Sequence, residues 1–343
     1  MKPIQNKWTR RLFLTVCGGA AVGGGLRSRA ATGEGGLSFG IVTDCHYADI
    51  PTAGSRFYRE SIAKLAECVA EMNKQQVDFL VELGDFKDQG QNAQESIAFL
   101  QTIEAEFARF EGPRHHALGN HDMDNLSKAQ FLANITNTGF ASAQAHYSFD
   151  MKGVHLVVLD ANFRADGTDY NAGNFDWTQA YIPAPQRAWL QADLAGTQLP
   201  TIVFIHQLLD GDGGDVYVKN AAEVRQILEA SGKVRAVFQG HHHTGAYTHK
   251  NGIHYYTLKG LIEGTGPTNS AYAIVRVMAD GSLDVTGYRK AESRLMAAPP
   301  PFLPVAAVSL AVALDTRLNV ESQSGLGVKI DTLTKPGTLL LAK

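Results

Sequence analysis

Cysteine and long apolar runs are both scarce in this chain of 343 residues. Of its three cysteines, Cys17 falls in a leader-like segment and only Cys45 and Cys68 follow it, which excludes a framework of several disulfides. We favour two buried thiols over a single bridge. With 44% apolar and 19% charged residues, the composition is typical of a globular chain with its own core, not of a disordered or membrane-embedded one.

Acidic residues are missing from residues 1–31, which hold six basic residues. The pair Arg10 and Arg11 precedes an uncharged stretch that ends at Leu26, a pattern typical of a twin-arginine leader. That stretch is short and rich in glycine for a membrane-spanning helix. We therefore expect residues 1–31 to be a signal peptide of a periplasmic or secreted protein, with no stable membrane anchor left after its removal.

Basic residues are the minority in the remainder of the chain. Residues 32–343 carry 25 basic and 34 acidic residues, so their net charge is −9. Such a chain lacks the basic surface that grips a phosphate backbone, and no nucleic-acid partner is expected. We place one domain at 32–290 and an extension of unknown role at 291–343. The extension is expected to be an extra strand or a loosely packed appendage, because four prolines interrupt its apolar run.

Short apolar runs alternate with amphipathic stretches from residue 37 onward. The runs are rich in Val, Ile, Leu and Phe, as buried strands are. In the segment 57–73, Leu65 and Val69 belong to an apolar stripe and Lys64 to the opposite, polar face. The alternation predicts an α/β fold with a largely parallel sheet in its first half. The predicted strands are 37–43, 77–83, 154–160, 201–205, 234–238, 252–258, 271–278 and 282–288, and the predicted helices are 57–73, 92–110, 185–195 and 219–231.

Polar side chains follow the first two predicted strands where they end. Asp44 and His46 come after strand 37–43, and in an extended segment residues two apart point to the same side. One carboxylate and one imidazole can therefore converge on a single cation. Asp85 ends strand 77–83 behind Gly84, which lets the backbone come close, and its two oxygens can bridge two metals.

Further candidate ligands follow later apolar runs. Asn120 offers a neutral carbonyl oxygen beside His121, which can supply a proton or a positive charge next to a phosphate. His206 follows strand 201–205, and His241 and His243 can face one way after strand 234–238. Each cluster alone has an ordinary explanation as a turn, a helix cap or a structural histidine. Together they indicate an open catalytic pair of metals, because oxygen and imidazole donors dominate and closely spaced cysteines are lacking.

The order Asp-x-His, Gly-Asp, Gly-Asn-His-Asp, His, Gly-His-x-His resembles that of the calcineurin-like metallophosphoesterases over residues 37–290. The resemblance implies a four-layer αββα sandwich of two mixed β-sheets flanked by helices, with a dinuclear centre at the strand ends and a small phosphorylated substrate. Two divalent or trivalent ions are implied, for which carboxylate, amide and imidazole ligands suit manganese, iron or zinc. In this resemblance Asp44, His46 and His243 hold one metal, Asn120, His206 and His241 hold the other, Asp85 bridges them, His121 is catalytic, and Asp122 orients it.

A narrower resemblance rests on residues 44–49, 58–61, 245–247 and 258–264. These segments are similar to the manganese-dependent ADP-ribose/CDP-alcohol diphosphatases, although that branch often has glutamine where His46 stands. The resemblance implies hydrolysis of a phosphoanhydride in a nucleoside diphosphate-linked compound by a metal-bound hydroxide. A phosphomonoesterase is the close alternative, and a nuclease or a noncatalytic metal-binding protein is a more distant one.

A long segment rich in Gly, Asn and Asp, 161–183, is expected to be a loop that shapes a binding site. Aromatic side chains could stack on a nucleobase, although packing is their commoner use. The candidates for stacking are Tyr47, Tyr58, Phe86, Phe163 and Tyr247.

Overall fold

The computed structural model describes residues 36–140 and 144–298. The predicted leader, 1–31, lies outside the described residues, as does the predicted extension from residue 299 onward. Within the described part, no helix combines the length and the apolar character that crossing a membrane requires. Cys45 and Cys68 are both buried and free, which confirms the prediction of two buried thiols.

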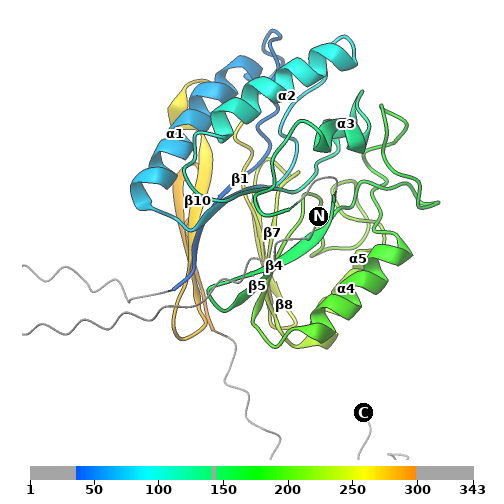
Figure 1. The fold of residues 1–343 in the computed structure, drawn as a ribbon, viewed down its shortest axis with the longest axis vertical. Helices are drawn as coiled ribbons and strands as arrows, with labels where there is room; N and C mark the ends of the chain where they lie inside the picture. The colour runs from blue at the N-terminus through cyan, green and yellow to red at the C-terminus, as the bar shows by residue number, and fades with distance from the viewer. Residues whose placement is uncertain (1–35, 141–143, 299–343) are drawn as a thin grey trace, which may run out of the picture. The chain divides into compact units, whose positions relative to one another are not determined.

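Two six-stranded mixed sheets lie at the centre of the fold (Figure 1). The strands are β1 Ser38–Val42, β2 Phe79–Glu82, β3 Arg114–His116, β4 Tyr147–Met151, β5 Val154–Val158, β6 Thr201–Phe204, β7 Val234–Gln239, β8 Ala246–Lys250, β9 Ile253–Thr257, β10 Ala271–Val277, β11 Leu283–Arg289 and β12 Arg294–Met296. The first sheet has the order β12-β11-β10-β1-β2-β3, and the second has the order β4-β5-β6-β7-β9-β8. Strands β1, β2 and β3 run parallel, and so do β5, β6, β7 and β9.

Helices cover the outer face of each sheet (Figure 1). The α-helices are α1 Ser61–Gln75, α2 Ala93–Phe107, α3 Lys128–Leu132, α4 Ala184–Gly196 and α5 Ala221–Ser231, and the 3₁₀ turns are η1 Tyr58–Glu60, η2 His121–Met123 and η3 Pro267–Asn269. The pair α1 and α2 packs on the first sheet, and the pair α4 and α5 packs on the second. The predicted four-layer αββα sandwich is confirmed.

Alternation along the strands divides the apolar side chains between two layers of core. In β2, Phe79 and Val81 face the second sheet, whereas Leu80 packs under α1 and α2. In β6, Phe204 joins the same inter-sheet core and Val203 packs under α4 and α5. Both faces of each central strand are therefore apolar, which is why these strands form continuous hydrophobic runs in the sequence.

Each of the eight predicted strands is present, with ends shifted by at most a few residues, but β3, β4, β8 and β12 were not predicted. These four are short or polar edge strands with little hydrophobic pattern of their own. Strand β12 continues the first sheet beyond residue 290, where we had placed the end of the domain. The prediction that Lys64 faces solvent is wrong: it is buried, and its ammonium donates to the backbone carbonyls of Leu261, Ile262, Glu263 and Gly264.

Candidate metal centre

The seven predicted ligands come from the carboxyl ends of five parallel strands in the two sheets. The loops after β1 and β2 carry Asp44, His46 and Asp85, and the loop after β3 carries Asn120. The loop after β6 carries His206, and the loop after β7 carries His241 and His243. Parallel strands end at the same edge of a sheet, so the packing of the two sheets brings these loops together.

Asp44, His46 and His243 form one group of ligand atoms. His243 Nε2 lies 3.2 Å from Asp44 Oδ1 and 3.1 Å from His46 Nε2. His46 Nε2 lies 3.7 Å from Asp44 Oδ1. One carboxylate oxygen and two imidazole nitrogens therefore face a common point, as the ligands of one cation do.

Asp85, His206 and His241 form a second group. Asp85 Oδ2 lies 3.2 Å from His206 Nε2, and His206 Nε2 lies 3.2 Å from His241 Nδ1. The same carboxylate oxygen is 3.5 Å from His46 Nε2 of the first group. Asp85 therefore lies between the two groups, the position that a bridging ligand requires.

Asn120 is held next to the second group through its neighbour. The backbone amide of His121 donates to Asp85 Oδ1 over 2.8 Å. Within the described part of the chain, two buried ligand oxygens at the centre have no hydrogen-bond partner: Asp44 Oδ1 and Asn120 Oδ1. Buried polar atoms are costly when they lack a partner, so oxygen atoms left in this state fit a site that binds cations.

The backbone at the centre is left-handed at four of the ligands. The φ angles are 51° at Asp44, 44° at His46, 56° at Asp85 and 66° at His241. Such angles strain residues with a Cβ and cluster at functional sites. The expected extended geometry is wrong at these four residues, because tight turns and not pleated strands aim their side chains at one another.

Two glycines let the loops after β2 and β3 approach each other. Gly84 has a φ of 102°, and a Cβ there would lie 2.6 Å from the backbone nitrogen of Gly119. A Cβ on Gly119 would collide with the backbone nitrogen and the carboxylate of Asp85. The predicted role of Gly84 in close backbone approach agrees with this packing.

In three of the histidines, Nδ1 is hydrogen-bonded while Nε2 faces the other candidate ligands. His243 Nδ1 lies 2.6 Å from Glu263 Oε1, and His46 Nδ1 lies 3.1 Å from Asp88 Oδ2. His206 Nδ1 lies 2.8 Å from the backbone carbonyl of Leu83. Such partners select the tautomer that presents the other nitrogen to a metal, as is usual for histidine ligands.

His121 projects from the 3₁₀ turn η2 beside His46, with 4.8 Å between the ring centroids. Its side chain is 27% exposed, more than those of Asp44, His46, Asp85, His206 and His243. Its Nδ1 lies 2.7 Å from Asp124 Oδ2. The prediction that Asp122 orients His121 is wrong, because Asp124 takes that place and the Asp122 carboxylate accepts instead from the backbone amides of Gly119, Asp85 and Phe86.

Opposite charges hold one another in their ionised forms. Burial raises the pKa of Asp44, but the charge of His243, aided by His46 and His206, outweighs it and holds the pKa well below its usual range. Burial lowers the pKa of His121, but the carboxylates of Asp85 and Asp124 outweigh it and raise the pKa to about 9. Burial, followed by the charge of His206, lowers the pKa of His241 to about 3, which keeps this imidazole neutral and able to bind a cation.

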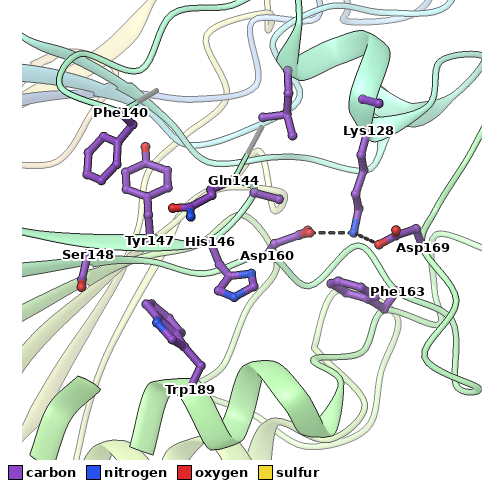
Figure 2. Close-up of a pocket in the computed structure, with 13 residues that line it drawn as sticks. Lys128, Phe140, Gln144, His146, Tyr147, Ser148, Asp160, Phe163, Asp169 and Trp189 are labelled. Carbon is purple, nitrogen blue, oxygen red and sulfur yellow. Dashed lines mark hydrogen bonds and ion pairs between the residues drawn. The ribbon is translucent and has the colours of Figure 1, made fainter. Parts of the chain in front are cut away.

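A cavity of about 650 Å³ lies apart from these ligands, none of which lines it (Figure 2). Lys128 Nζ lies 2.6 Å from a carboxylate oxygen of both Asp160 and Asp169, and it sits over the ring of Phe163. The single cation is outnumbered by its two acidic partners. This cavity is therefore a poor place for a phosphate group.

The five aromatic residues considered for stacking have other partners. Phe86 is buried against Phe107, Tyr47 packs on Phe99, and Tyr58 is buried. Phe163 lies under Lys128, and Tyr247 lies under Arg294. Sequence reasoning also missed the partners of the three histidines, Asp88, Asp124 and Glu263, of which Glu263 alone belongs to a segment that carried the family resemblance.

Known proteins resemble this chain in sequence and in fold. The calcineurin-like phosphoesterase family matches residues 37–245. The manganese-dependent ADP-ribose/CDP-alcohol diphosphatase of Oryza sativa subsp. japonica is 28% identical over 309 residues, covering 78% of this chain and 96% of that protein. The Homo sapiens protein of the same name is 24% identical, with 76% and 92% covered. A dimetal phosphatase from Danio rerio has the same fold, with a TM-score of 0.65 at 21% identity, and the match covers 77% of this chain and 99% of that one.

The family match takes in all the strand ends from β1 to β7 and every predicted ligand. It extends over more than half of the chain. The chain therefore belongs to the calcineurin-like phosphoesterase family and is a metal-dependent hydrolase of phosphoric esters or anhydrides.

Proposed function

We propose that this enzyme is a manganese-dependent diphosphatase that cleaves the phosphoanhydride of nucleoside diphosphate-linked compounds such as ADP-ribose or CDP-alcohols. The observation that carries the proposal is the pair of ligand groups with the Asp85 carboxylate between them. Relatives that bear this activity in their names are 23–28% identical to the chain and match 71–78% of it.

Each group of side chains has a distinct task in this proposal. Asp44, His46 and His243 would hold one metal, Asn120, His206 and His241 would hold the other, and Asp85 would contact both. When bound, the metals supply a hydroxide nucleophile at neutral pH and positive charge for the phosphoryl oxygens. His121 donates a proton to the departing oxygen, since Asp124 holds its ring and favours its charged form.

Arg56 supports a diphosphate over a monoester as the substrate. Its Nη1 lies 3.6 Å from Asp88 Oδ2, so the guanidinium is beside the carboxylate that holds His46. The side chain is 32% exposed. By contrast, Lys64 and Lys87 direct their ammonium groups at backbone carbonyls. A guanidinium that remains open to solvent can bind a second phosphate through parallel hydrogen bonds, and a monoester has no such group to offer.

An assay of the manganese-reconstituted enzyme tests the proposal. ADP-ribose and CDP-choline should be hydrolysed with a higher kcat/KM than p-nitrophenyl phosphate or bis(p-nitrophenyl) phosphate. Arg56→Ala should raise KM for ADP-ribose and leave that for p-nitrophenyl phosphate unchanged, with Arg59→Ala, an exposed neighbour paired with Asp49, as the control. A preference for the monoester would instead establish a phosphomonoesterase, and a preference for the diester would favour a nuclease-like activity.

We also propose that residues 1–31 direct export by the twin-arginine route. The support is the Arg10–Arg11 pair, the uncharged stretch after it and the absence of acidic residues. Replacing both arginines by lysine should leave the protein in the cytoplasm of a bacterial host, whereas the unaltered chain should reach the periplasm. Equal distribution of the two forms on fractionation would contradict the proposal.

A further inference from the structure

An exposed tryptophan lies against the metal centre. Trp177 is 45% exposed, and the centroid of its ring lies 5.6 Å from that of His241 at an interplanar angle of 66°. Single exposed apolar side chains are common on protein surfaces, so the exposure alone indicates nothing. Met278 is equally exposed, but it lies beside the turn between β10 and β11. The contact with a ligand of the metal centre distinguishes Trp177.

The turn that carries Trp177 is fixed on both sides. Phe175 stacks on the buried ring of Tyr170, with centroids 4.1 Å apart and planes inclined by 8°. The Asp176 carboxylate accepts from the backbone amide and the hydroxyl of Thr178 over 2.9 and 2.7 Å. The backbone amide of Gln179 donates to the Asp176 carbonyl over 2.9 Å. The exposed position of the indole is therefore built into the turn.

The same loop is docked on the segment that carries the proposed proton donor. The backbone amide of Gly173, where φ is 75°, donates to the carbonyl of Met123 over 3.0 Å. The amide of Ala172 donates to the carbonyl of Leu126 over 2.9 Å. Met123 ends the 3₁₀ turn that begins at His121. The indole and the His121 imidazole therefore belong to one continuous scaffold and stand at a fixed relation to each other.

The chemistry of the two sides of the centre differs. Trp177 lies on the side of His241, whereas Arg56 lies on the side of His46 and Asp88. A large flat indole that is open to solvent favours a stacked aromatic partner, and such stacking is tolerant of which base is present. The five aromatic side chains considered from the sequence are engaged in packing or lie under a basic side chain, so they do not compete for this role.

We propose that Trp177 stacks on the nucleobase of the substrate and so selects nucleotide-linked diphosphates over diphosphates without a base. The inference rests on the proposed function and adds the group that recognises the base. It makes Trp177 a specificity residue that contacts substrate without taking part in bond cleavage.

Kinetics of Trp177→Ala on two substrates provide the first test. KM for ADP-ribose should rise ~5- to ~100-fold, as expected for loss of one stacked base, with kcat nearly unchanged. Trp177→Phe should recover most of the loss. Neither variant should alter KM for a P1,P2-dialkyl diphosphate, which has the anhydride and no base, and Met278→Ala should change nothing. An equal change in KM for both substrates, or no change in either, would overturn the inference.

Binding of reaction products separates this inference from the proposed function. AMP and CMP should quench the tryptophan fluorescence of the manganese-loaded enzyme, AMP more strongly, and ribose 5-phosphate should not. The quenching should disappear in Trp177→Ala and persist in Trp189→Phe. Quenching of this pattern in an enzyme that fails to cleave ADP-ribose would contradict the proposed activity and support the stacking role of Trp177. Cleavage of ADP-ribose without quenching, and with an unchanged KM in Trp177→Ala, would support the proposed activity and contradict the stacking role.

Discussion

The two sheets contribute different donors to one centre. Among the candidate ligands, the first sheet carries every oxygen donor together with one imidazole, and the second sheet carries imidazoles alone. Three of the four candidate ligands with a left-handed backbone conformation also lie on the first sheet. There the Asp122 carboxylate accepts hydrogen bonds from several backbone amides of the loops after β2 and β3. Neither sheet can assemble the pair of sites by itself. The first sheet's ligands are Asp44, His46, Asp85 and Asn120, and the second sheet's are His206, His241 and His243.

Metals bound at the proposed centre would link the two sheets as well as serve catalysis. Binding that requires both halves stabilises the state in which the sheets are packed together. The same division separates tasks: charged oxygens attract the cations, and a neutral imidazole such as His241 binds without repelling them. Substitutions on the two sheets should therefore fail in different ways.

The largest effect is expected at Asp85, which is within reach of both ligand groups. Asp85→Asn removes the charge between the groups, so both metals should be lost and hydrolysis should fall below detection. His243→Asn touches one group and should release one metal. Metal content after dialysis, measured by mass spectrometry beside the exposed control Asp215→Asn, checks the difference. Retention of both metals in Asp85→Asn would remove the bridging role.

The next largest effect is expected at His121. Its imidazole has no other assigned task than proton donation, so His121→Ala should lose about 100- to 10,000-fold in kcat with its metals in place. Asp124→Asn should lose less, because the ring stays but its orientation and charge are weakened. Asp122→Asn should differ in kind, with lower stability and lower metal content, because its carboxylate holds the loop of Asp85. Metal loss in His121→Ala would contradict this assignment.

Much of the fold and of the centre could be predicted because apolar runs mark the central strands and the ligands follow their ends. The loops after β1, β2, β6 and β7 are examples, in which burial on both strand faces left a clear hydrophobic pattern. Edge strands such as β4 and β8 have weaker patterns, since they are only partly buried.

Partners across the fold could not be foreseen. Asp122 is adjacent to His121 in sequence, but the 3₁₀ turn η2 brings the carboxylate of Asp124, three residues on, to the imidazole instead. Glu263 meets His243 only because the chain returns along β9. Lys64 is buried by a loop about 200 residues later in the sequence, and the helical periodicity around Lys64 cannot predict that contact.

A smaller effect is expected from the carboxylates that bind the Nδ1 atoms of His243 and His46, away from the proposed metals. Glu263→Gln weakens the support of His243 on the second sheet, and Asp88→Asn weakens that of His46 on the first. Either change should lower the affinity for Mn²⁺ by about 10- to 100-fold. Calorimetric titration with Mn²⁺ measures it, with the exposed Glu111→Gln as the control. If only one substitution lowers the affinity for Mn²⁺, the two carboxylates do not support their histidines equally.

An effect on stability alone, with no change in activity, is expected at a contact between the sheets that involves no candidate ligand. His115 on β3 is buried and stacks on Phe149 of β4, with ring centroids 4.2 Å apart. Burial, followed by the charge of His116, lowers the pKa of His115 to about 3, below its usual value near 6.5. The folded state therefore keeps a neutral ring while the unfolded chain takes up a proton. The stability that this ring contributes is complete above the unfolded pKa and is lost as the pH falls toward the folded one.

At pH 5 the loss should be about 2 kcal/mol relative to pH 7, from the difference between the two pKa values. His115→Phe keeps an aromatic ring on Phe149 and removes the proton, so its free energy of unfolding should fall by about 2 kcal/mol less than that of the parent over this range. Acid titration of the metal ligands affects both proteins and cancels in the difference. Urea unfolding at both pH values, with the exposed His249→Phe as the control, measures it. Parallel losses would mean that His115 does not supply this part of the pH dependence.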